Sequence, residues 1–156
     1  MGVLVGVSAL AVAVISRSND DGGSAFVPVT GAVAVEVVDI VDGDTLHVET
    51  VDGQPLTIRL FGVDTPERGE PCFTEATNRL RELAGDRVQL LADTRLQDFA
   101  GRELRYVYGE NGALIDAILI GEGFAVAWTE DGAFRDELVT IEAQATAARI
   151  GCLWSS

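Results

Sequence analysis

The chain has 156 residues, of which 47% are hydrophobic, enough to bury one core, so we expect a single domain. Its 25 acidic and 11 basic residues give a formal net charge of −14, the wrong sign for a protein that holds nucleic acid by basic patches. One histidine and two cysteines are too few soft ligands for a zinc site. An anionic substrate would therefore have to be met by a bound cation and a few placed arginines.

The N-terminal residues 2–15 form an unbroken run of apolar or small residues. This run is shorter than the roughly 20 residues that span a bilayer, and it matches the apolar core of a signal peptide or a truncated membrane anchor. We therefore predict that residues 1–18 are a signal peptide or N-terminal membrane anchor and that the protein is secreted or held in the cell envelope. The alternative is a buried helix or strand. Residues 19–31 predict a flexible tether before a folded domain over 32–156.

The first predicted elements of this domain form a meander of three strands. Residues 34–41 are rich in Val and Ile, and a turn leads into a second strand over residues 44–49, in which apolar and polar residues alternate. Asp52-Gly53 is a two-residue hairpin signal, after which the chain returns as a strand over residues 55–63. The alternation places one face of these strands in the core, with Asp44 at the start of that face.

Helices and two further strands follow the meander. Pro71 suits the first turn of a helix, apolar residues then recur at three- and four-residue spacing, and Gly85 ends the pattern. Later patterns predict strands over 87–92 and 103–108, a short extended piece over 124–128, and helices over 113–120 and 134–148, the last capped by Gly151. This order is typical of an α+β fold, a five-stranded OB-fold barrel with three α-helices.

Two aspartates are expected to converge at one edge of the meander. Asp44 begins the second strand and Asp64 ends the third, and a tight hairpin joins these strands as antiparallel neighbours. Two adjacent carboxylates repel each other unless a cation lies between them, and oxygen ligands favour Ca²⁺ or Mg²⁺. The alternative is two solvated turn aspartates, but the pair together favours a metal site.

Three further residues near this edge have the chemistry for phosphodiester cleavage. Glu67 lies three residues past Asp64 and would polarise a water as general base; alternatively it favours the dipole of the following helix, and its position does not decide between these roles. Arg59 and Arg102 would clamp a phosphate and stabilise its transition state. The alternative for each arginine is a surface salt bridge.

Four stretches of the sequence together carry a family resemblance. They are VDGDT at 41–45, IRLFGVDTPE at 58–67, GR at 101–102 and EAQA at 142–145. In this order they resemble the staphylococcal (micrococcal) nuclease, or thermonuclease, family, over about residues 37–154. The resemblance implies an OB barrel with three helices and calcium-dependent hydrolysis of DNA and RNA, with the 5′ P–O bond broken and 3′-phosphates left.

The resemblance also assigns roles residue by residue. It implies calcium ligands at Asp44, Asp64 and the Thr65 backbone carbonyl, a general base at Glu67, and phosphate contacts at Arg59 and Arg102. All six positions are filled as the family requires. We further expect single-stranded or locally melted DNA and RNA as substrates, and a monomeric protein.

Other positions depart from the family pattern. Phe99 and Ala100 stand where the family commonly has a basic residue and a tyrosine, and the loop over residues 68–70 is short and nearly neutral. Trp128 is followed by Thr129 where an aromatic pair is expected. These changes bear on substrate affinity and leave the catalytic set intact. Phe99 and Trp128 are candidates for stacking a base, with a place in the core as the alternative for Trp128.

The two cysteines, Cys72 and Cys152, lie far apart in the sequence. An exported protein meets oxidising conditions, so we predict a disulfide that ties the C-terminal helix to the barrel. The alternative is two unpaired buried thiols.

Two other functions remain open from the sequence. One is an OB-fold module that binds nucleic acid or protein without cleaving it, for which no metal is needed. The other is an acidic exported domain whose carboxylates bind only structural calcium, so that calcium removal lowers the melting temperature and no substrate is cut.

Overall fold

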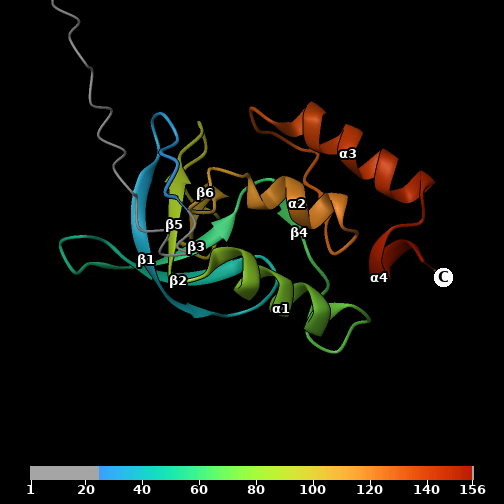
Figure 1. Cartoon of the computed structure of the whole chain (residues 1–156), viewed down its shortest axis with the longest axis horizontal. Coiled ribbons are helices and arrows are strands. Elements are labelled where there is room, and N and C mark those ends of the chain that lie inside the picture. The colour runs from blue at the N-terminus through green and yellow to red at the C-terminus, as the bar shows by residue number, and fades with distance from the viewer. Residues whose placement is uncertain (1–24, 156) are drawn as a thin grey trace, which may run out of the picture.

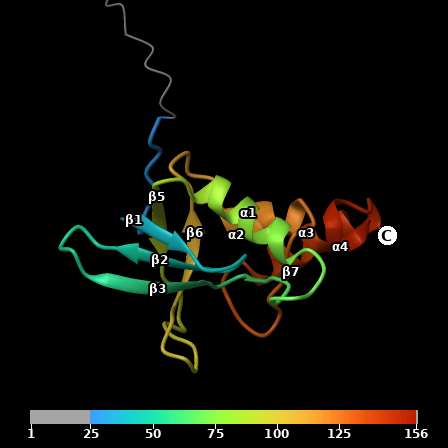
Figure 2. The same ribbon diagram turned by 90° about the horizontal axis from the view of Figure 1, so that it is seen from below.

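The computed structural model describes residues 25–155, so the predicted leader (1–18) and residues 19–24 of the predicted tether lie outside the described residues. Five strands close a barrel in the order β1-β2-β3-β6-β5. The strands are β1 (Val33–Ile40), β2 (Thr45–Glu49), β3 (Pro55–Leu60), β5 (Arg87–Leu91) and β6 (Glu103–Tyr108). The barrel lies on one side of the molecule and the helices on the other (Figures 1 and 2). This architecture confirms the predicted α+β class and OB-fold barrel.

The meander has the register that its alternating sequence predicts. Strands β1, β2 and β3 are antiparallel neighbours, whereas β3 and β6 pair in parallel to bring the second half of the chain into the barrel. Inward-facing residues of β2 and β3 are at most 1% exposed: Leu46, Val48, Ile58 and Leu60. Alternate side chains of a strand point to opposite faces, so burial of this set fixes which side chains of the two strands face outward.

The predicted strand over residues 55–63 is wrong at its C-terminal end. β3 stops at Leu60, and a separate strand, β4 (Val63–Asp64), pairs with β7 (Val126–Ala127) in a small second sheet. Gly62 lies at the break, where a Cβ atom would be only 2.3 Å from Leu138 Cδ1. The absence of a side chain at Gly62 therefore lets the chain pass close to the helical layer, and Asp64 belongs to the small sheet.

Four helices lie within residues 25–155, where the sequence predicted three. They are α1 (Phe73–Ala84), α2 (Ile115–Gly121), α3 (Arg135–Ala147) and α4 (Gly151–Trp154). Arg149 adopts a φ of 54° and Gly151 a φ of 73°, and this left-handed backbone ends α3, within one residue of the predicted helix end, and turns the chain into α4. None of these helices combines the length and apolar character required to cross a bilayer.

Part of the segment predicted as a tether lies against the barrel. The Val27 N–H donates to the Glu110 carbonyl (2.7 Å), and the Val29 N–H donates to Gln89 Oε1 (2.8 Å). Gln89 is 2% exposed and returns a hydrogen bond from Nε2 to the Val27 carbonyl (2.9 Å). Contacts with the domain therefore begin before residue 32.

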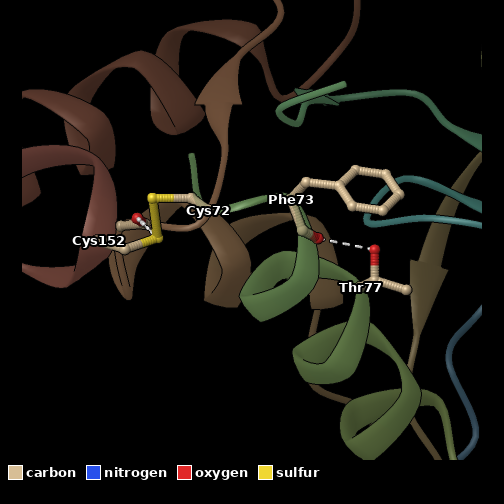
Figure 3. Close-up of a disulfide and its surroundings, with 5 residues drawn as sticks. Cys72, Phe73, Thr77 and Cys152 are labelled. Atoms are coloured by element: carbon tan, nitrogen blue, oxygen red, sulfur yellow. Dashed lines mark hydrogen bonds between the residues drawn. A yellow bond between two sulfur atoms is a disulfide. The ribbon is translucent and has the colours of Figure 1, made fainter. Parts of the chain in front are cut away.

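A disulfide joins Cys72 to Cys152, with 5.8 Å between the Cα atoms, which confirms the predicted bond. Cys72 precedes the first turn of α1, where the Thr77 hydroxyl donates to the Phe73 carbonyl (2.8 Å; Figure 3). Cys152 lies in α4, so the disulfide fastens the C-terminal helix to the start of α1.

Removing this disulfide is expected to destabilise the protein. The bond closes a separation of 80 residues, for which chain entropy predicts about 4–5 kcal/mol, with measured values for native disulfides of about 2–5 kcal/mol. We therefore expect Cys152→Ser to lower the free energy of unfolding by about 2–5 kcal/mol in urea titrations under oxidising conditions. Adding reductant should bring the native protein to the same midpoint. Equal midpoints for the oxidised native protein and the variant would contradict this expectation.

Candidate active site

Asp44 immediately precedes β2 and is only 5% exposed. Its Oδ2 accepts hydrogen bonds from the Thr65 N–H (3.0 Å) and the Thr65 hydroxyl (2.9 Å), and its backbone carbonyl accepts from the Leu60 N–H (2.8 Å). Asp44 thereby joins the start of β2 to the end of β3 and to the residue after β4. The Thr65 carbonyl is the remaining polar atom of that residue, and it is the atom for which the sequence predicted a metal contact.

Arg59 lies between the two aspartates that were predicted to converge. Its Nε is 3.2 Å from Asp44 Oδ1, and its Nη2 is 2.9 Å from Asp64 Oδ1. Its Nη1 donates to the carbonyls of Leu60 (2.8 Å) and Val63 (2.7 Å). The Arg59 side chain is only 12% exposed. Its guanidinium group thus holds together both carboxylates and the break between β3 and β4.

Desolvation raises the pKa values of both aspartates, although the side chain of Asp64 is still 55% exposed. Desolvation is the main cause at Asp44, where Arg59 opposes it and Asp42 reinforces it. Desolvation also leads at Asp64, where Arg59 again opposes the rise and the Asp44 charge adds to it. Both carboxylates would therefore be ionised more easily with further positive charge beside them.

The donors at this edge fit a hard divalent cation. Two carboxylates and a backbone carbonyl are oxygen ligands of the type that Ca²⁺ prefers. Within residues 25–155, no cluster of three or more His, Cys, Asp or Glu side chains is placed to hold a metal. The candidate protein ligands at this edge are Asp44, Asp64 and the Thr65 carbonyl.

Glu67 lies in the loop between β4 and α1. The residue is exposed, and its backbone N–H donates to Glu70 Oε2 (2.7 Å), which tightens the loop. The carboxylate of Glu67 is therefore open to solvent near the strand end that carries Asp64. This position suits a group that must accept a proton from water.

Arg102 is fixed by its own loop. Its Nε lies 2.5 Å from Asp98 Oδ2, and its Nη1 donates to Thr45 Oγ1 (3.3 Å). Asp98 Oδ1 also accepts from the backbone N–H groups of Ala100 (2.9 Å) and Arg102 (3.0 Å). Burial alone would raise the pKa of Asp98, but these hydrogen bonds outweigh it and lower the pKa. Asp98 therefore acts as an ionised brace for the loop, a role that the sequence did not reveal.

One pocket of about 280 Å³ collects the predicted substrate residues. Arg59 and Arg102 line it together with Phe99 and Trp128. Phe99 is fully exposed, and Trp128 is half-buried with its indole N–H donating to Asp131 Oδ1 (2.7 Å), so Trp128 belongs to the pocket wall and not to the core. The pocket combines cations with aromatic surfaces, a pairing that suits a phosphate beside a base.

One buried carboxylate was not predicted from the sequence. Asp116 is fully buried in α2, where Oδ1 accepts from the Gly62 N–H (2.9 Å) and Oδ2 from the Val107 N–H (3.0 Å). It ties the break between β3 and β4 to β6, and so supports the strand end that carries Arg59. The available signal was an acid inside the apolar run ALIDAILIG at 113–121.

The ionisation of Asp116 is expected to make stability depend on pH. Desolvation raises the pKa of Asp116 from 3.8 to about 6 against the pull of its hydrogen bonds. The stabilisation from its protonated form is therefore complete below pH 3.8 and is lost as the pH rises through 6, a difference of about 3 kcal/mol. In urea titrations between pH 4 and 7, the native protein should lose about this much stability relative to Asp116→Asn. A pH-independent difference would contradict the assignment.

A barrel that brings carboxylates, guanidinium groups and an aromatic pocket to one strand end has the components of a phosphodiester-cleaving protein. Residues 57–156 match the family described as Staphylococcal nuclease homologue. A micrococcal nuclease of Shigella flexneri is 36% identical over 129 residues, which cover 77% of this chain and 72% of that protein. A thermonuclease of Staphylococcus intermedius is 34% identical over 116 residues, covering 69% and 68%.

A third relative carries a different name. Protein ParB of Escherichia coli is 33% identical over 129 residues, covering 77% of this chain and 71% of that protein. The family match covers more than half of the chain, and these relatives exceed 30% identity over more than two thirds of their own lengths. The chain therefore belongs to the staphylococcal nuclease family, and its relatives support a nuclease-like function.

Proposed function

We propose that the protein is a calcium-dependent nuclease that hydrolyses the phosphodiester bonds of DNA and RNA, breaking the 5′ P–O bond and leaving 3′-phosphates. The observation that carries the proposal is the position of Arg59, which contacts both Asp44 and Asp64 and lines the same pocket as Arg102. This arrangement puts the candidate ion ligands beside the groups that would hold a phosphate.

The residues of the site divide the reaction between them. Asp44, Asp64 and the Thr65 carbonyl would hold Ca²⁺, which when bound supplies positive charge to the phosphate oxygens. Arg59 and Arg102 bind the phosphate and stabilise the charge that develops on it. The exposed carboxylate of Glu67 takes a proton from the attacking water.

The pocket and the charge of the chain define the substrate. Phe99 and Trp128 would receive a base by stacking, which tolerates different bases and suits both DNA and RNA. A base stacked inside a duplex cannot reach these side chains, so single-stranded or locally melted nucleic acid is the proposed substrate. With a net charge of −14, the protein repels the phosphate backbone away from the pocket. Every group in the proposed site comes from one chain, as a monomer requires.

Digestion of single-stranded DNA by the purified protein tests the proposal. We expect cleavage with Ca²⁺, no cleavage with chelator, and 3′-phosphates in an end-group analysis of the products. Cleavage that continues in chelator would contradict the calcium dependence, and 5′-phosphate products would contradict the cleaved bond. The same digestion of RNA tests the breadth of the substrate class.

The alternative is a non-catalytic OB-fold module that binds nucleic acid or protein. The observation that favours it is Phe99, which is fully exposed on its loop and offers an apolar contact to a partner. Binding without cleavage, together with a rise in melting temperature on adding Ca²⁺, would support this alternative.

We also propose that the protein works outside the cytoplasm, either secreted or tethered in the cell envelope. The disulfide between Cys72 and Cys152 supports this location, since such bonds persist in oxidising compartments. Cell fractionation with an antibody against the protein tests it, and a purely cytoplasmic signal would contradict it.

A further inference from the structure

Arg95 lies against two aromatic rings on the wall of the pocket. Its guanidinium carbon is 5.0 Å from the centre of the Phe61 ring and 5.6 Å from that of Trp128. Phe61 is only 2% exposed and packs on Tyr106, with ring centres 5.1 Å apart. The core side of this arrangement is therefore rigid, and Arg95 connects it to the half-buried indole of Trp128.

Asp131 fixes both Arg95 and Trp128. Its Oδ2 accepts from Arg95 Nε (2.8 Å), and its Oδ1 accepts from Arg95 Nη2 (2.8 Å) and from the indole Nε1 of Trp128 (2.7 Å). The hydrogen bonds from Arg95 lower the pKa of Asp131, so the carboxylate stays ionised. A bidentate guanidinium–carboxylate pair holds a defined geometry, and here the same carboxylate anchors the indole N–H.

We propose that Arg95 and Asp131 are positioning residues that hold Trp128 as a fixed stacking surface for one nucleobase of the substrate. The inference rests on the proposed nuclease function and adds the residues that prepare the pocket for a base. Arg95 differs in role from Arg59 and Arg102, because its guanidinium both pairs with Asp131 and lies over the Phe61 and Trp128 rings. The pair acts through Trp128 and does not touch the phosphate.

The expected benefit of this arrangement is pre-organisation. Phe99 is fully exposed and offers area without a fixed orientation, so Trp128 is the ordered aromatic surface of the pocket. If a side chain is mobile in the free protein and must be ordered when the substrate binds, the affinity falls by about 2- to 10-fold. Disrupting the pair should therefore raise KM for base-bearing substrates by about 2- to 10-fold and leave kcat unchanged.

The test uses Asp131→Asn and Arg95→Lys, each in the full chain with Trp154→Phe, so that Trp128 is the only tryptophan. The Trp154 indole nitrogen is buried without a hydrogen-bond partner within the described residues, so its replacement loses no bond. Arg95→Lys keeps the charge and loses the bidentate fork. It replaces Asp131→Asn in the test if circular dichroism shows that Asp131→Asn does not fold. The first readout is the time-resolved fluorescence anisotropy of Trp128 in the free protein.

The second readout compares two single-stranded oligonucleotides that contain one cleavable linkage, flanked either by normal nucleotides or by abasic ones. We expect faster local motion of Trp128 in both variants, a higher KM on the base-bearing oligonucleotide, and an unchanged KM on the abasic one. The matched control is Glu110→Gln, which breaks a similar pair outside the pocket: Arg87 Nε lies 2.9 Å from Glu110 Oε1 while its guanidinium covers Phe26 at 4.6 Å.

Unchanged anisotropy in the variants would overturn the inference, as would equal KM changes on the two oligonucleotides or a selective loss of kcat. If the native protein cuts neither oligonucleotide, the proposed nuclease function fails. The anisotropy of the free protein decides separately whether Arg95 and Asp131 hold Trp128 in place.

Discussion

Replacing Glu67 with Gln is expected to lower kcat by about 10²–10⁴-fold, the contribution typical of a general base. Glutamine has nearly the same shape but cannot accept the proton of the attacking water. The described side-chain contacts of Asp44 and Asp64 are with Arg59, Thr45 and Thr65 and do not include Glu67, so Ca²⁺ affinity should change little. The measurements are kcat on single-stranded DNA at saturating Ca²⁺ and the Ca²⁺ affinity by calorimetry.

The control for this variant is Glu75→Gln. Glu75 is an exposed acid in the first turn of α1, so its replacement removes one negative charge of the same kind outside the site. We expect native activity from the control. If Glu67→Gln turns over substrate at the native rate, Glu67 is not the base, and its place before α1 then serves the helix dipole.

The barrel was predictable because its strands follow a simple rule. Leu46, Val48, Ile58 and Leu60 alternate with outward-facing residues, and the Asp52-Gly53 turn sets their register. That register brings Asp44 to Leu60 and Arg59, so the Asp44 side of the site was visible in the sequence. Asp64 instead reaches Arg59 from the small sheet, after the break at Gly62. The alternating pattern predicts these strands because every second residue is buried on one face of the sheet.

The small sheet and the last turn of chain were not predictable by the same rule. β4 and β7 have two residues each, too few for any period to show. The left-handed backbone at Arg149 gives no signal in the sequence, since such a conformation is uncommon in residues other than glycine. Both features depend on tertiary packing, as the close approach of Gly62 to Leu138 illustrates.

The pairing of charges in the site was also out of reach. With 25 acidic residues in the sequence, nothing separates the carboxylates that brace an arginine from those that are merely solvated. Asp98 beside Arg102 and Asp131 beside Arg95 are recognisable only from their distances. The sequence identified Arg59 and Arg102 as site residues but not Arg95, and it did not identify the carboxylates of Asp98 and Asp131 that hold Arg102 and Arg95 in place.

Replacing Arg102 with Ala should lower kcat by about 10²–10³-fold, which corresponds to about 3–4 kcal/mol of lost transition-state stabilisation. Arg102 is a cleaner test than Arg59, because Arg59 also holds Asp44 and Asp64 and its loss would disturb the candidate ion ligands. The described polar contacts of the Arg102 side chain are with Asp98 and Thr45. Neither residue is in the predicted metal set, and Arg102 meets Asp44 only through the Thr45 hydroxyl, which donates to Asp44 Oδ1 (3.1 Å). Ca²⁺ affinity should therefore be kept while turnover falls.

Two further variants separate the effect of the charge of Arg102 from the effect of its shape and provide a control. Arg102→Lys keeps a positive charge but loses the planar fork that matches a phosphate, so its kcat should lie between those of the native protein and Arg102→Ala. Arg81→Ala removes an equal charge from the exposed last turn of α1 and should leave kcat unchanged. A native rate in Arg102→Ala would refute the phosphate clamp, because the clamp requires Arg102 to stabilise the charge of the transition state. A graded loss from lysine to alanine would instead show that both the charge and the shape of the guanidinium act on the transition state.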